Sequence, residues 1–128
     1  MNSWKEFALT ISARETFEML IGSGALGFPW YRVDTHPADN IDQDTWVLAF
    51  TELDFGSSGA GIAQHVITHD DVVRSVQKIA GSEGNFVDDA VRRQCQELVA
   101  RGPEAGIFCA DAADQVIQFA AFGKVIYR

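Results

Sequence analysis

Apolar and polar positions in the first half of the chain predict one short helix followed by strands. Ser12 and Glu15 form a capping-box pattern, and apolar residues recur at helical spacing after it, so we expect a helix over residues 13–21 that ends at Gly22. The glycine-rich stretch DFGSSGAG predicts an antiparallel hairpin between the last two strands. Aromatic and β-branched runs place the strands at residues 30–33, 45–53 and 62–67.

The second half shows the 3.6-residue periodicity of amphipathic helices. An apolar stripe that stops at Gly81 predicts a helix over residues 72–80, and Asp88 opens another that runs to about Arg101. Asp111 caps a last helix that ends at Gly123. Because residues Val116 to Phe122 of this helix are apolar on nearly every side, it is either central to the core or half of a homo-oligomer interface.

These elements combine into one α+β domain over residues 1–128, with a small, mainly antiparallel sheet of about three strands packed against about four helices. A hydrophobic content of 47% is sufficient to bury a core without disulfides or a structural metal. The longest uncharged stretch, residues 55–69, is too polar to span a bilayer, and the N-terminal residues lack a signal-peptide pattern. We therefore expect a soluble, cytoplasmic protein in which Cys95 is a buried small hydrophobe and a Cys95–Cys109 disulfide has no support.

Negative charge is concentrated in one part of the chain. The formal net charge is −8, yet residues 1–32 and 74–128 are each balanced, so the imbalance lies in residues 33–73, which contain no Lys or Arg. An acidic field repels nucleic-acid phosphates and anionic lipids and attracts a basic protein surface. The alternative is that these carboxylates only keep the protein soluble. They belong to Asp34, Asp39, Asp42, Asp44, Glu52, Asp54, Asp70 and Asp71.

All three histidines lie in the same acidic segment, two of them in the stretch HVITHDD. His65 and His69 have the four-residue spacing that brings two imidazoles to one helical face for zinc. However, the β-branched residues between them favour a strand, and Thr68 with Asp71 forms a helix-capping pattern that explains most of the stretch. A divalent metal site remains the alternative, with four candidate ligands: His36, His65, His69 and Asp70.

Two further sequence motifs resemble ligand-binding loops, but the residues around or within them do not fit such loops. The stretch from Gly22 to Gly27 spells G-x-G-x-x-G, but it follows a predicted helix and leads into Pro29, whereas a dinucleotide fingerprint follows a strand and opens a helix. The acidic stretch DNIDQD, residues 39–44, offers oxygen ligands for calcium but lacks the glycine and the final glutamate of an EF-hand loop.

Two segments, ITHDDVVRSVQKIA (residues 67–80) and DAADQVIQFAAFGKVIYR (residues 111–128), resemble small uncharacterised proteins encoded by actinobacterial phages. The resemblance covers about a quarter of the chain and contains no catalytic motif. It implies a cytoplasmic, phage-derived protein and transfers no functional residue.

The charge pattern favours a non-enzymatic interaction module that engages a basic surface of a partner protein, without direct nucleic-acid or membrane binding. Two alternatives stay open. One is a metal-dependent hydrolase built on the three histidines, which requires these side chains to converge, and the other is a small-ligand binder that uses the two glycine-rich loops. The interaction module predicts dispersed carboxylates instead. Its candidate binding residues are Asp34, Asp39, Asp42, Asp44, Glu52 and Asp54, with Trp30 and Tyr31 as aromatic anchors.

Overall fold

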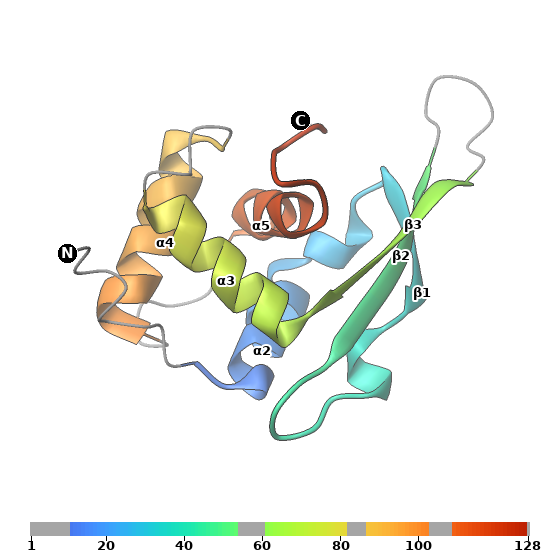
Figure 1. The fold of residues 1–128 in the computed structure, drawn as a ribbon, viewed down its shortest axis with the longest axis horizontal. Helices are drawn as coiled ribbons and strands as arrows, with labels where there is room; N and C mark the ends of the chain where they lie inside the picture. Colours follow the sequence, from blue (N-terminus) through green and yellow to red (C-terminus); the bar gives the residue numbers. More distant parts are fainter. Residues whose placement is uncertain (1–10, 54–60, 82–86, 103–108, 128) are drawn as a thin grey trace.

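A computed structural model describes residues 11–53, 61–81, 87–102 and 109–127 of the chain. These residues form four α-helices and a three-stranded antiparallel sheet, so the α+β prediction is confirmed. The sheet lies at one side of the molecule, and the helices cover one of its two faces (Figure 1). Figure 1 labels the α-helices and strands. In chain order, with the short 3-10 helices written η, the elements are α2 (Ala13–Ser23), η1 (Ala25–Gly27), β1 (Tyr31–Thr35), η2 (Pro37–Asp39), β2 (Val47–Leu53), β3 (Gly61–Thr68), α3 (His69–Ala80), α4 (Asp89–Arg101) and α5 (Ala110–Phe122).

Two helices begin with the capping boxes that the sequence predicts. The Ser12 hydroxyl accepts from the Glu15 backbone N–H at 3.1 Å, and the Glu15 carboxylate accepts from the Ser12 N–H at 2.9 Å. Thr68 and Asp71 make the same reciprocal arrangement at the start of α3. Each box satisfies backbone donors that a helix start leaves unpaired, so a local pattern defines where the helix begins.

Other helix ends differ from the sequence predictions. Helix α2 continues past Gly22 to Ser23, because the left-handed residue that ends it is Gly24, with φ of 83°. Helix α5 starts before Asp111, which lies inside its first turn and does not cap it. At its other end, Gly123 adopts φ of 74° and closes the helix as expected.

The sheet has the order β1-β2-β3, and both pairs are antiparallel. Its register pairs Tyr31 with Glu52 and Phe50 with His65, so these side chains share the face that the helices cover. The opposite face has no helix over it in Figure 1. Within the described ranges, no helix has the length and apolarity needed to cross a bilayer.

Helix α5 is the central element of the core. Every residue from Ala112 to Phe119 is buried, including the polar Asp114, Gln115 and Gln118. Of the two alternatives that the sequence left open for Val116 to Phe122, the structure shows the central position in the core, because α2, α3, α4 and the sheet pack against this helix. Its apolar circumference reflects neighbours within the same chain. The homo-oligomer interface stays a prediction.

Candidate functional site

The four predicted metal ligands do not form a site. His65 pairs with Glu52 at 3.1 Å, His69 hydrogen-bonds the Thr16 hydroxyl at 2.8 Å, and His36 accepts from the backbone N–H of Ala38. Asp70 is exposed in the first turn of α3. Across the part of the chain that the structure describes, no three His, Cys, Asp or Glu side chains are grouped to hold a metal ion, so the predicted cluster is wrong. Strand β3 ends and α3 begins between His65 and His69, and this change of element removes the helical spacing on which the motif depended.

The acidic residues of segment 33–73 are spread over several elements. Asp34 lies on the uncovered face of the sheet, where Thr51, Gln64 and Arg32 donate to it, and the Thr51 hydrogen bond is the main cause of its lowered pKa. Asp42 has a lowered pKa because its carboxylate accepts the backbone N–H groups of Asp44 and Thr45. Asp39 and Asp44 are exposed beside it, whereas Asp54 lies outside the described residues.

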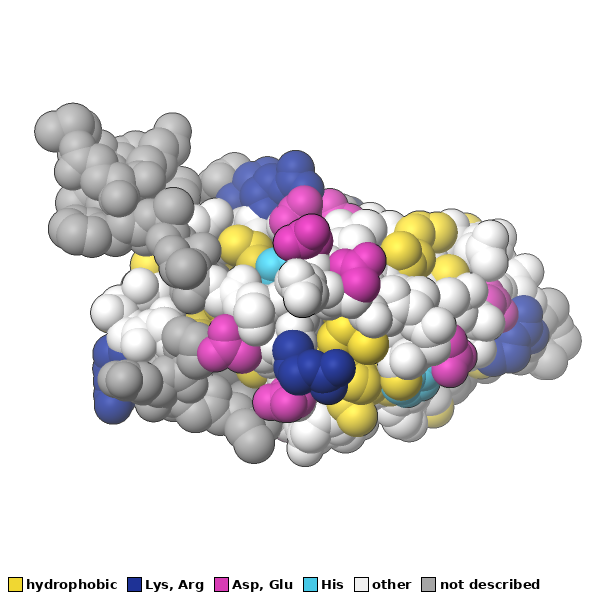
Figure 2. Space-filling model, turned by 90° about the horizontal axis from the view of Figure 1, so that it is seen from below, with side chains coloured by type: hydrophobic (Ala, Val, Ile, Leu, Met, Phe, Trp, Pro, Cys, Tyr) yellow, Lys and Arg dark blue, Asp and Glu magenta, His cyan; other side chains and the backbone are white. Residues whose placement is uncertain are grey.

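On the face seen in Figure 2, Asp and Glu side chains are scattered among polar and apolar groups. Glu52 is half-buried on the covered face of the sheet, where it pairs with His65 and accepts from the hydroxyl of Tyr127. Several of these carboxylates therefore stabilise the sheet and its connections, and they form no single acidic block.

Trp30 and Tyr31 are core residues and not exposed anchors. Their exposed fractions are 3% and 5%, and the ring of Trp30 stacks on that of Tyr127 at 4.9 Å between centroids. The Tyr31 hydroxyl donates to the carbonyl of Ala25 at 2.7 Å, and burial raises the pKa of this phenol. The sequence prediction of aromatic anchors at these two positions is corrected by their burial, because large rings on the covered face of a sheet pack into the core.

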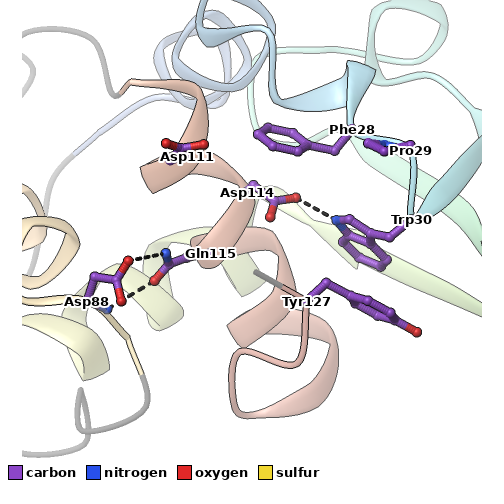
Figure 3. Close-up of a pocket in the computed structure, with 8 residues that line it drawn as sticks. All are labelled: Phe28, Pro29, Trp30, Asp88, Asp111, Asp114, Gln115 and Tyr127. Carbon is purple, nitrogen blue, oxygen red and sulfur yellow. Dashed lines mark hydrogen bonds between the residues drawn. The ribbon is translucent and has the colours of Figure 1, made fainter.

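A different group of residues forms a cavity of about 470 Å³, between the first turns of α5, the N-cap of α4 and the segment before β1 (Figure 3). This volume is within the ~300–1,000 Å³ range of small-ligand pockets. Figure 3 shows Phe28 and Trp30 reaching toward α5, which presents its aspartates to them. The lining residues are Phe28, Pro29, Trp30, Asp88, Asp111, Asp114, Gln115 and Tyr127.

The carboxyl group of Asp114 is the buried acid of this pocket. It accepts the indole N–H of Trp30 at 2.7 Å and the side-chain amide of Gln118 at 2.7 Å. Burial raises the pKa of Asp114, and the negative charge of Asp111 adds to the rise, while the two hydrogen bonds act in the opposite direction. Each carboxyl oxygen has two lone pairs, and each uses one of them in these hydrogen bonds. Each oxygen can therefore accept one further hydrogen bond from a ligand in the pocket.

Gln118 joins the pocket residue Asp114 to the segment that follows α5. Its amide group, fully buried, donates to Asp114 and to the carbonyl of Tyr127, and its oxygen accepts the backbone N–H groups of Ile126 and Tyr127 at 2.8 Å. This fixes the segment that follows α5, so that Tyr127 covers Trp30. At the rim, Gln115 exchanges two hydrogen bonds with Asp88, the N-cap residue of α4.

The sequence contained a signal for this site, namely polar residues inside an otherwise apolar helix. Asp114 and Gln118 are four residues apart and therefore lie on one helical face. What local patterns do not supply is the third partner, since Trp30 lies 84 positions before Asp114.

The sequence also suggested the two glycine-rich loops as ligand-binding segments. The first glycine-rich loop ends α2 and forms η1, and only the residues directly after it, Phe28 to Trp30, line the cavity. Most of the second, residues 54–60, lies outside the described residues. No protein-family model, curated protein or solved structure matches this chain, so the resemblance to phage proteins stays a prediction.

Proposed function

We propose that this protein binds a partner protein through a basic side chain, lysine or arginine, that enters the pocket lined by Phe28, Trp30 and Asp114. The observation that carries the proposal is a buried carboxyl group, that of Asp114, which lines a cavity together with aromatic side chains. Aromatic ring faces attract cations, and a carboxylate accepts charge-assisted hydrogen bonds from ammonium and guanidinium groups. We propose the cytoplasm, predicted from the sequence, as the compartment of this interaction.

Charge supports a cation over an anion. Asp88, Asp111 and Asp114 all line the pocket, and the chain as a whole has a formal net charge of −8. The N-terminal end of α5 by itself favours an anion, but the aspartates in its first turns offset that dipole. The dispersed carboxylates of residues 33–73 and the separated histidines support an interaction module over a metal-dependent hydrolase. The net negative charge of the chain attracts a basic partner surface at long range, and the pocket binds its basic side chain once the two proteins are in contact.

The proposal is tested with five-residue peptides in which one arginine or one lysine is the only charged side chain, and with guanidinium and butylammonium chloride as free cations. The indole N–H signal of Trp30 in a two-dimensional NMR spectrum reports on the pocket, because this group bonds Asp114 directly. We expect the Trp30 signal to shift with the basic peptides and to stay constant with a glutamine peptide of the same length. A response to the free cations alone would assign the site to a small molecule, and no response to either class would overturn the proposal.

Removal of the Asp111 carboxylate, which lines the pocket, is expected to weaken peptide binding. Asp111→Asn deletes one negative charge in the first turn of α5, and we expect about a fivefold higher Kd, which corresponds to the ~1 kcal/mol upper value of exposed ion pairs. The matched control is Asp70→Asn, because Asp70 is an exposed aspartate in the first turn of α3 and does not line the pocket. Equal weakening by both variants would show that net charge alone, and not the pocket, attracts the peptide.

Peptide binding is also expected to strengthen as pH rises from 4 to 8. Burial raises the pKa of Asp114, so the neutral acid persists to higher pH than in an exposed aspartate, and a cation binds the ionised form more tightly. Affinity therefore increases through the range in which Asp114 loses its proton, and binding releases a proton. Calorimetric titration in buffers of different ionisation enthalpy measures this release. In the Asp114→Asn variant, with its fold verified by NMR, the slope of affinity against pH should be smaller. An unchanged slope would show that another group causes the pH dependence.

A further inference from the structure

A second cavity lies between α3 and the C-terminal end of α5, two helices that pack beside each other (Figure 1). Its volume is about 360 Å³, within the ~300–1,000 Å³ range of small-ligand pockets. Helix α3 contributes Asp71, Arg74, Ser75 and Lys78, whose spacing of three and four residues places them on one helical face. This cavity shares no lining residue with the pocket around Asp114, so it is a separate candidate site.

Ser75 supplies a buried hydroxyl that the fold does not use. Its exposed fraction is 5%, it lines the cavity, and among the described residues it has no hydrogen-bond partner. A serine or threonine inside a helix often bonds a carbonyl of the preceding turn, as Thr16 does with the carbonyl of Ala13 at 3.0 Å. A buried hydroxyl without a partner costs free energy. The position of Ser75 on the cavity wall therefore points to a ligand that supplies the partner.

The charged side chains beside Ser75 favour an anion as this ligand. Arg74 donates to Asp71 at 3.0 Å through one of its terminal nitrogens, which leaves further guanidinium N–H groups, and Lys78 forms no ion pair with a described residue. Two cations against one carboxylate give the cavity a net positive charge, although the whole chain has a formal net charge of −8. Because salt screens exposed charges beyond about 8 Å at physiological ionic strength, the nearby cations decide the sign at contact.

We propose that this cavity binds a phosphate group, either as free inorganic phosphate or as part of a small phosphate monoester. A phosphate group offers three strong acceptor oxygens, so it can accept from a guanidinium, an ammonium and a hydroxyl group at once, whereas a carboxylate has only two oxygens. Arginine and lysine are both phosphate-binding residues. A phosphate ion fills only part of the cavity, and the remaining space beside Phe119 accommodates the organic group of an ester.

The alternative role of the two cations is structural. The carbonyl groups at the C-terminal end of α5 attract positive charge, and Arg74 and Lys78 lie close enough to offset that dipole. This role does not account for Ser75, because a neutral hydroxyl without a partner adds nothing to such compensation. The phosphate group accounts for all three side chains.

Two-dimensional NMR of the whole chain in phosphate-free buffer tests the proposal. The probes are sodium phosphate and phenyl phosphate, with sodium chloride at matched ionic strength as the reference. We expect saturable shifts of the backbone signals of Ser75, Lys78 and Gly123, while the indole N–H signal of Trp30 stays constant because Trp30 lines the other pocket. Tighter binding of phenyl phosphate would assign the site to an ester, and equal binding to free phosphate. The absence of a saturable shift with both probes, or the same shift with chloride, would overturn the proposal.

Removal of one cation is expected to weaken binding of the probe. Lys78→Gln should raise the Kd about fivefold, since it deletes one of the two positive charges that line the cavity. The matched control is Arg93→Gln, because Arg93 is an exposed basic residue of α4 that does not line the cavity. Equal weakening by both variants would contradict the proposal, since net charge alone would then explain the binding.

Ser75→Ala separates ligand binding from folding. Because the hydroxyl has no partner among the described residues and alanine is the better helix former, we expect an unchanged or higher urea midpoint. In the same variant, the Kd for the phosphate probe should rise about threefold, as expected for the loss of one hydrogen bond. An unchanged Kd would contradict the proposal, because the hydroxyl would then not contact the ligand.

Discussion

Replacement of Gln118 by leucine is expected to lower the free energy of unfolding by about 3 kcal/mol, because a substitution of similar size leaves several buried polar groups without partners. The backbone N–H groups of Ile126 and Tyr127 lose their acceptor, and the Tyr127 carbonyl loses its donor. The Asp114 carboxyl loses one of its two hydrogen bonds in the same step. Urea denaturation followed by circular dichroism measures the change in free energy.

Gln115→Leu is the matched control for this prediction, since it is the same substitution in the same helix. Gln115 makes two hydrogen bonds to the N-cap residue Asp88, which is exposed and can bind water instead. We therefore expect a loss of only about 1 kcal/mol for Gln115→Leu. Equal losses for the two variants would show that Gln118 is not the principal attachment of the segment after α5.

Trp46→Phe is the second change with a large expected effect, about 2–3 kcal/mol of unfolding free energy. Trp46 is fully buried, and its indole N–H donates to the Thr16 hydroxyl at 2.9 Å and to the Ala13 carbonyl at 3.0 Å. Phenylalanine removes this donor and leaves a gap where the larger ring packed. The effect is expected to be a lower denaturation midpoint in urea with an unchanged slope, since the folded state remains equally compact.

A double-mutant cycle with Thr16→Val separates the hydrogen bond from the gap. The Thr16 hydroxyl also contacts His69, so it joins α2, α3 and the residue before β2 in one buried polar cluster. We expect the losses of Trp46→Phe and Thr16→Val to be non-additive by about 1 kcal/mol, the typical net value of one hydrogen bond. Additive losses would mean that the two side chains contribute independently.

The sequence predicted the helix and strand boundaries correctly where a local interaction defines them. Both capping boxes, the glycine that closes α5 and the hairpin between β2 and β3 depend on residues a few positions apart, so they can be inferred from short patterns. The N-terminal boundary of α5 was missed because Cys109 occupies the cap position without a side-chain hydrogen bond to the helix start, while Asp111 in the first turn has the residue type expected of a cap.

The candidate site was predictable only in part. The high density of acidic residues indicated a site in residues 33–73. Charge counts do not distinguish an aspartate that contacts solvent alone from one that caps a loop or bridges strands, as Asp42 and Asp34 do. The histidine spacing suggested a metal site, and the change from strand to helix between His65 and His69 separated the two rings. The pocket itself was not predicted, because its walls come from segments far apart in the chain.

The sequence by itself determined the α+β class, the main helix and strand segments and the acidic character of the protein. These follow from periodicity, capping patterns and composition, which act over a few residues or over the whole chain at once. Only the tertiary structure decided that Trp30 is a wall of a pocket and that Asp114 is its buried acid. Burial depends on which distant segments meet, and a hydrogen bond across 84 positions leaves no trace in the local pattern.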